Sequence, residues 1–230
     1  MTGSAPILYF APSTCARVTL TALEEIAQPF ETKLVAFMAG EHRSQEYLAI
    51  NPSGKVPALK TETGVLTQNG AILLYLAQTY PDVGLLPLSG DPHADASVVS
   101  ALFRLSSDLH PLVTRFVIPG MVVSDPATAP HVRMKAEEVL KLQLAPIAAQ
   151  LAIQDWLMGD RWSILDAYFA WIWFRITGAG FEPAIFPAIA SHYDRAGERP
   201  SAKAALQREA SAQEQLTARG LAFVPPNIKK

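Results

Sequence analysis

Hydrophobic and polar positions follow two different periods in the first eighty residues. Ile7–Phe10 is a short apolar run bounded by prolines and predicts a strand. From Ser13 to Ala27 the apolar residues recur at helical spacing, and Phe30–Phe37 predicts a second strand. The polar stretch after that strand has room for a short helix. The remaining elements are two strands and a helix, at Val56–Lys60, Gly64–Thr67 and Ala71–Tyr80.

The order of these elements is βαβαββα, and it predicts a mixed four-stranded sheet. Two strands joined through a helix imply a parallel pair with a right-handed crossover. The later two strands lie close enough in sequence to form an antiparallel hairpin. We therefore expect an α/β domain whose sheet is covered by helices.

The pattern changes beyond residue 80. Tyr80–Pro92 is rich in Pro and Gly and predicts a linker. No persuasive strand follows it, and apolar residues from Val98 to Phe116 step by three or four, which predicts a long helix. Other helices are expected at about His131–Ile153, at Ser163–Thr177, and as shorter segments after Pro183 and Pro200.

Two domains follow from this change in pattern. We expect an α/β domain over residues 1–80, a linker over 81–92 and an all-helical domain over 93–230. The last stretch, Gly220–Lys230, contains Pro-Pro and is expected to be an extended tail.

Composition and charge narrow the classes of protein to be considered. Half of the 230 residues are hydrophobic and 17% are charged, which is enough apolar material for a sizeable core. The formal net charge is −2 with no block of like charge, so nucleic acid and anionic membranes are not expected partners. The single cysteine excludes an intrachain disulfide, and no signal peptide is evident at the start. The longest apolar run, Ala167–Phe174, is too short to span a bilayer, so we expect a cytoplasmic protein.

The only cysteine, Cys15, lies where the first strand is expected to turn into the first helix. The start of a helix exposes unpaired N–H groups and the positive end of the helix dipole, and both stabilise a thiolate. The same environment would stabilise the thiolate of a bound small thiol. Ser13 or Thr14 can equally cap the helix, with Cys15 as a small buried hydrophobe. The turn alone leaves both interpretations open.

Two other segments bear on this choice. In NPSGKVPAL, Val56 precedes Pro57 at the start of a strand, which suits a cis peptide turn with the Val56 backbone facing outward. Such a residue can pair with an extended peptide, although Pro57 can also simply begin the strand. In LTQNGAI, Asn69 has the pattern of a helix N-cap, and backbone N–H groups there can receive a carboxylate.

Together, the cysteine turn, the N-P-x-G-x-V-P-x-L segment and the turn before the next helix resemble the cytosolic glutathione transferase family. The pattern is similar to that of the bacterial members of the family, in the beta-like or a related class. The resemblance covers essentially the whole chain. The resemblance implies a thioredoxin-like first domain that binds glutathione as co-substrate. It also implies that the helical domain forms most of the pocket for an electrophile.

The resemblance assigns roles to individual positions. Cys15 matches the cysteine of the beta-type members, while Ser13 and Thr14 lie where other classes place their activating serine. Val56 and Pro57 match the loop that grips the cysteinyl backbone of glutathione. The turn S-T-C-A-R-V also resembles S-C-x-W-R-V of the zeta-type isomerases, with one residue fewer.

Four further positions are implied to bind glutathione. Gln68 and Asn69 fall at the pair that holds the γ-glutamyl end, with Asn69 replacing the usual serine or threonine. His42 resembles a position that contacts the glycyl carboxylate, and Lys55 can add positive charge there.

The helical domain contains two predicted pocket residues and one structural motif. His110 resembles a helix histidine near the catalytic cysteine of some beta-type members, although a histidine before a proline can also line a kink. Phe103 is expected to line the same second-substrate pocket. Ser163 and Asp166 fit a capping box, each side chain accepting from the other's backbone, at the start of an aromatic-rich helix. We interpret those aromatic residues as core.

The sequence thus predicts a glutathione S-transferase that activates the glutathione thiolate at the start of the first helix for attack on a hydrophobic electrophile. The alternatives are a glutathione-dependent isomerase, an ether-cleaving or dehalogenating enzyme, thiol–disulfide exchange through Cys15, and a non-catalytic binding module. The family resemblance implies a homodimer. No metal site is expected, because the five histidines are scattered, and no dinucleotide fingerprint is present.

Overall fold

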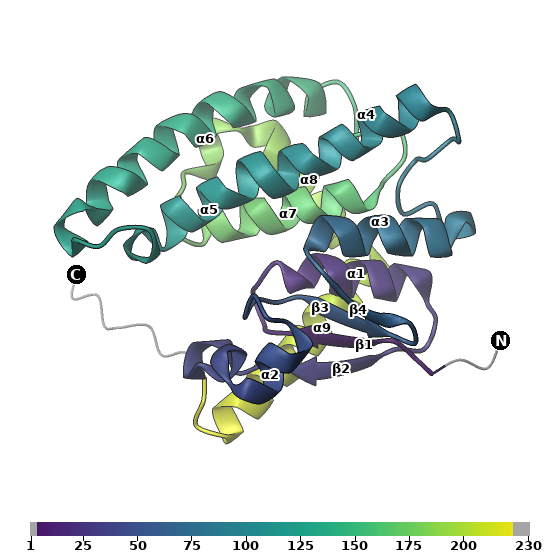
Figure 1. The fold of residues 1–230 in the computed structure, drawn as a ribbon. Helices are drawn as coiled ribbons and strands as arrows, with labels where there is room; N and C mark the ends of the chain where they lie inside the picture. Colours follow the sequence, from purple (N-terminus) through teal and green to yellow (C-terminus); the bar gives the residue numbers. More distant parts are fainter. Residues whose placement is uncertain (1–3, 223–230) are drawn as a thin grey trace.

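The computed structural model describes residues 4–222, which form a four-stranded sheet followed by a set of helices (Figure 1). The strands are β1 (Ile7–Phe10), β2 (Glu31–Leu34), β3 (Ala58–Thr61) and β4 (Gly64–Thr67), in the spatial order β2-β1-β3-β4. β1 pairs with β2 in parallel and with β3 antiparallel, and β3 and β4 form a hairpin. The predicted mixed sheet and thioredoxin-like architecture are confirmed.

β1 is central because its side chains can be buried on both faces of the sheet. Leu8, Tyr9 and Phe10 are all buried, which explains why this strand reads as a continuous apolar run. β2 lies at an edge and alternates between exposed and half-buried positions. It ends at Leu34, three residues before the predicted end, because its partner β1 ends at Phe10, opposite Leu34.

Three helices belong to the same part of the chain: α1 (Ala16–Ile26), α2 (Gln45–Ile50) and α3 (Asn69–Thr79). α1 and α3 lie between the sheet and the helical domain (Figure 1). α1 is buried on nearly all sides because it contacts α3, α7 and α9 as well as β1.

The rest of the described chain is helical, as predicted. Its helices are α4 (Pro92–Phe103), α5 (His110–Val117), α6 (Ala129–Leu151), α7 (Ile164–Thr177), α8 (Pro187–Gly197) and α9 (Pro200–Ala218). The predicted long helix between residues 98 and 116 is divided by a π-helical segment, Arg104–Leu109. The division precedes Pro111, which lacks the N–H that an uninterrupted α-helix would require. Residues 223–230 of the predicted tail lie outside the described residues.

α9 is longer than expected, and it returns to the first domain, where it packs along α1 (Figure 1). Three ion pairs join the two helices: Arg208 with Glu24, Arg199 with Glu25, and Arg17 with Glu209. The Arg17–Glu209 pair is almost completely buried, with side-chain exposures of 13% and 6%. The helical domain is therefore attached to the first helix by charged as well as apolar contacts.

Candidate functional site

The turn between β1 and α1 brings the three predicted catalytic side chains together, but in different roles. The Thr14 hydroxyl donates to the Ala11 carbonyl at 2.7 Å and accepts from the Ala16 N–H at 3.3 Å. It is therefore occupied by the backbone of its own turn. The Ser13 hydroxyl has no hydrogen-bond partner among residues 4–222, and the residue has a left-handed φ of 63°. That conformation is uncommon for a residue with a Cβ and often marks a functional site.

Cys15 faces the loop that contains Val56. Its Sγ donates to the Val56 carbonyl oxygen at 3.5 Å, and the Cys15 backbone N–H has no acceptor on another residue within the described part of the chain. Burial raises the pKa of the Cys15 thiol to about 12, and its own backbone N–H and the nearby positive charges of Arg175 and Lys55 offset this only in part. At neutral pH the thiol is therefore protonated and acts as a hydrogen-bond donor.

This state predicts low chemical reactivity of Cys15. Only the thiolate is alkylated, so at pH 8 iodoacetamide should modify Cys15 at least about a thousandfold more slowly than a free thiol of pKa near 8.5. Because the chain has a single cysteine, intact-mass measurement gives the rate directly. The rate should still be rising at the highest pH at which the protein stays folded. A plateau below pH 8 would instead identify a stabilised thiolate.

The NPSGK loop holds Val56 in place. Asn51 Nδ2 and the Tyr47 hydroxyl both donate to the Lys55 carbonyl at 2.6 Å. The Val56–Pro57 peptide bond is cis, as the sequence pattern predicts. Within residues 4–222 the Val56 N–H has no acceptor, so it is available to a ligand. The Val56 carbonyl already accepts a hydrogen bond from the Cys15 thiol.

Gln68 and Asn69 differ from expectation in their local structure. α3 begins at Asn69, and Gln68 is the residue at its N-cap, so the assignment of Asn69 as the cap was wrong. The Asn69 side chain is buried, where it accepts from the Thr19 hydroxyl at 2.6 Å and donates to the Cys15 carbonyl at 2.7 Å. It therefore ties the start of α3 to the start of α1. Gln68 is exposed with φ of 69°, so its side chain is available.

Lys55 ends the NPSGK loop, and His42 lies beside that loop, with its carbonyl oxygen close to Gly54. The His42 ring stacks on Phe37 with centroids 3.9 Å apart, and its buried Nδ1 has no partner among the described residues. The Lys55 side chain is exposed, and its charge acts on both Cys15 and His110. Both residues thus have polar atoms that a carboxylate could satisfy.

His110 lies close to the predicted site, and the sequence did not predict its hydrogen-bond partner, Tyr168. Its Nδ1 is 2.9 Å from the Tyr168 hydroxyl, and its ring packs edge-on against Trp171. Burial, with the charges of Lys55 and Arg175, lowers the pKa of His110 to about 4, so the imidazole is neutral at pH 7. Tyr168 is buried with the other aromatic residues of α7, as expected, but its hydroxyl also orients His110. Phe103 is 60% exposed at the end of α4, and a place in the pocket stays a prediction.

Ser163 and Asp166 form the two reciprocal contacts of a capping box at the start of α7. The Asp166 carboxylate accepts from the Ser163 N–H at 2.8 Å, from the Leu157 N–H at 2.8 Å, and pairs with His192 Nε2 at 2.9 Å. Asp166 and His192 are fully buried. His192 had no sequence signal, because its role depends on α8 packing against α7.

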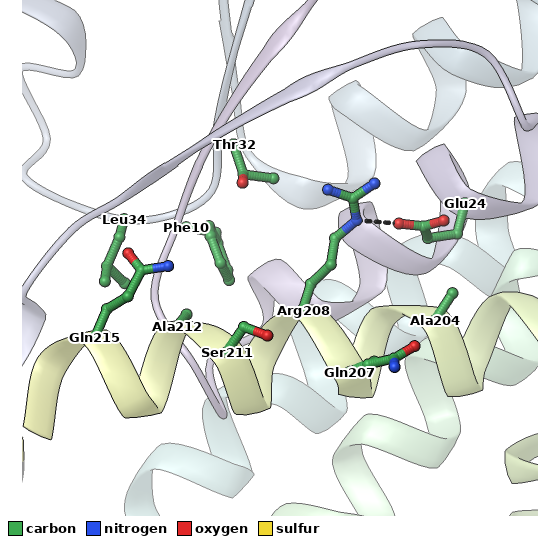
Figure 2. Close-up of a pocket in the computed structure, with 10 residues that line it drawn as sticks. All are labelled: Phe10, Glu24, Thr32, Leu34, Ala204, Gln207, Arg208, Ser211, Ala212 and Gln215. Atoms are coloured by element: carbon green, nitrogen blue, oxygen red, sulfur yellow. Dashed lines mark hydrogen bonds and ion pairs between the residues drawn. The ribbon is translucent and has the colours of Figure 1, made fainter.

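The structure also contains a cavity of about 550 Å³ that was not predicted (Figure 2). It lies between α9 and the strands β1 and β2, and the Glu24–Arg208 ion pair lies at its wall. None of the predicted site residues lines it, and its lining has no thiol or imidazole. Its lining therefore offers no group for the thiol chemistry that the sequence predicts.

Residues 4–222 lack two other kinds of site. That part of the chain holds no cluster of three or more His, Cys, Asp or Glu side chains with the arrangement of a metal site. None of its helices combines the length and the apolar character needed to cross a membrane.

Known proteins resemble this chain in both sequence and structure. Residues 5–78 match the family model described as "Glutathione S-transferase, N-terminal domain". The glutathione S-transferase GstA of Escherichia coli O157:H7 is 30% identical over 207 residues, which are 88% of this chain and 98% of that protein. The maleylacetoacetate isomerase of Pseudomonas aeruginosa is 35% identical over 130 residues, 56% of this chain and 60% of that protein.

A solved structure gives the same result. The sphingomonad glutathione S-transferase, complexed with glutathione, superposes with a TM-score of 0.77 at 31% identity, covering 89% of this chain and 98% of that one. Because these similarities cover both the sheet and the helical domain, the chain belongs to the glutathione S-transferase family.

Proposed function

We propose that this glutathione transferase binds glutathione across the Val56 loop and the turn at Gln68, with the glutathione sulfur at the Ser13–Cys15 turn. The observation that carries the proposal is the state of the Val56 backbone. Its N–H has no acceptor among residues 4–222, and its carbonyl faces Cys15. An extended peptide can pair with such a residue as with a strand edge. The exposed Gln68 and the unpartnered His42 Nδ1 supply polar groups for the two carboxylate ends.

In this mode Cys15 activates the glutathione sulfur by donating to it. The Cys15 N–H lies at the positive end of α1, and the Cys15 thiol becomes a second donor once a backbone N–H of the bound peptide replaces it at the Val56 carbonyl. A hydrogen bond to the charged form of a thiol lowers its pKa. The Ser13 hydroxyl is a third candidate donor, because it has no partner among the described residues. Thr14 is the weakest candidate, since its hydroxyl is already bonded on both sides.

The chemistry that follows is nucleophilic substitution or addition. The glutathione thiol loses its proton to solvent, the sulfur attacks an electrophilic carbon, and a sulfur–carbon bond forms. In a substitution, the bond to the leaving group breaks and the leaving group takes the electron pair. In an addition, the π bond breaks and its electron pair takes up a proton from solvent. The electrophile would enter beside His110, whose neutral ring adjoins the apolar surface of Trp171.

Calorimetry of glutathione binding tests this proposal with wild type and Cys15→Ala side by side. We expect both proteins to bind, because Val56, Gln68 and His42 remain, and we expect conjugation by Cys15→Ala to be slower. Absence of binding by the wild type would refute the proposal.

The isomerase alternative is favoured by one observation, the 35% identity with a maleylacetoacetate isomerase over part of each chain. Isomerisation regenerates glutathione, whereas conjugation consumes it. Counting free thiols before and after turnover therefore separates the two reactions.

Two further aspects of the proposal concern the whole protein. We propose that it acts as a homodimer in the cytoplasm, as the family resemblance implies. Sedimentation velocity tests the dimer, and fractionation of the source cells tests the location.

A further inference from the structure

The strained residue of the catalytic turn is held by side chains from the helical domain. The Ser13 N–H donates to Glu209 Oε1 of α9 at 3.0 Å. The Ser13 carbonyl accepts from Trp171 Nε1 at 3.3 Å and from Arg175 Nη1 at 3.2 Å, both on α7. Both polar groups of a single peptide residue are thus bound by two helices that are distant in sequence.

Glu209 is an unusual residue to find at this place. It is 5% exposed, and its second oxygen accepts from Arg17 Nε at 3.0 Å and from Arg17 Nη2 at 2.6 Å. The Arg17 guanidinium lies 4.0 Å from the centre of the Phe174 ring. Burial of a carboxylate is costly unless it is paired and hydrogen-bonded, and here the Ser13 N–H is one of its partners.

Arg175 is different, because no ion pair within residues 4–222 includes it. Its positive charge acts on Cys15, and its guanidinium is bound to the Ser13 carbonyl. Glu209 pairs with Arg17, and its charge also acts on Arg175. The cations whose charges act on Cys15 are Arg175 and Lys55.

We propose that Glu209 and Arg175 are positioning residues for the reaction: they clamp the Ser13 peptide in its left-handed conformation, which places the Cys15 N–H toward the glutathione sulfur. The catalytic consequence of this clamp rests on the proposed function. The geometric basis of the clamp does not, because a residue with a Cβ keeps a left-handed φ only where its surroundings hold it. The catalytic turn thus depends on the helical domain.

Glycine provides the decisive test, because it adopts a φ of 63° without steric cost. Ser13→Gly and Ser13→Ala both lack the hydroxyl, but only the alanine still needs the clamp. We would introduce Glu209→Gln into wild type and into each of these backgrounds. The matched control is Glu214→Gln, an exposed glutamate on the same helix.

The first readout is the pKa of the bound glutathione thiol, followed by the ultraviolet absorbance of its thiolate at saturating glutathione. In wild type and in Ser13→Ala, Glu209→Gln should raise this pKa by about one unit, a tenfold fall in the acid dissociation constant of the thiol. In Ser13→Gly the acid dissociation constant should change by less than about threefold. If Glu209 acted only through its charge, the substitution would lower the pKa of the glutathione thiol, because Arg17 would be left unpaired. That change is opposite in sign to the one we expect. An equal change in both backgrounds would overturn the proposal.

The second readout needs no glutathione and separates failure of this proposal from failure of the proposed function. Alkylation of Cys15 at high pH should accelerate on Glu209→Gln in the Ser13→Ala background and stay unchanged in Ser13→Gly. If wild type fails to bind glutathione but this difference persists, the clamp stands and the proposed function falls. If alkylation responds identically in both backgrounds, the clamp itself is refuted.

Discussion

Replacing Asp166 with alanine is expected to lower the free energy of unfolding by about 3–5 kcal/mol, because several buried polar groups lose their partner at once and each unsatisfied group costs about 1–3 kcal/mol. The carboxylate accepts from the Ser163 N–H, the Ser163 hydroxyl and the Leu157 N–H and contacts His192 Nε2, and all four groups lose their partner together. His192 Nδ1 already has no partner among residues 4–222, so the ring would be left without any bond there. The shift in the urea midpoint, followed by tryptophan fluorescence, measures this loss.

Two control variants set the scale for this loss of stability. Ser163→Ala removes only the cap and should cost about 1 kcal/mol. Asp194→Ala alters an exposed aspartate on α8 and should change stability by less than about 0.5 kcal/mol. If Asp166→Ala proves no worse than Ser163→Ala, the carboxylate is a cap and not the junction between α7 and α8.

Gly54→Ala is expected to weaken glutathione binding by at least about tenfold, or about 1.4 kcal/mol. Gly54 has a left-handed φ of 61°, and an added Cβ would lie 3.0 Å from the His42 carbonyl oxygen. That carbonyl is backbone, so relief requires movement of the loop that presents Lys55 and Val56. Calorimetry with wild type and Gly54→Ala measures the change in affinity directly.

The matched control is Gly90→Ala in the linker. Gly90 also has a left-handed φ, 84°, but an added Cβ meets no atom within 4 Å. This variant therefore isolates the conformational cost from the close contact. We expect it to lose some stability and to bind glutathione as wild type does. Equal affinity for Gly54→Ala and Gly90→Ala would contradict the role assigned to the loop.

The order of strands and most helix positions could be predicted because local periodicity reports burial. The apolar run of β1 is buried on both faces, and β4 occupies its predicted residues 64–67. The length of α9 was underestimated because its buried stripe has one large apolar residue and otherwise consists of small or polar residues. These are Ser201, Ala205, Glu209, Ala212 and Leu216. A buried glutamate in such a stripe hides the helical period, and only tertiary contacts explain it.

The predicted site residues could be proposed from motifs, since Cys15, Val56 and Gln68 each lie in a short recognisable segment. Their partners could not. Ser13 and Glu209 are 196 positions apart, and neither has a pattern that links it to the other. Asn69 shows a related limit: a capping residue type at a helix start predicts a cap, but the side chain instead joins α1 to α3.

The separation of Ser13 from Glu209 has a consequence for the synthesis of the protein. At 5–20 residues per second, the ribosome needs roughly 10–40 s to translate the 196 positions between them. During that interval the catalytic turn has emerged with the first domain while its clamp has not been made. A nascent chain or a product of early termination therefore carries the cysteine without the groups that orient it. On our proposal, the turn is clamped only after α9 has left the exit tunnel and packed along α1.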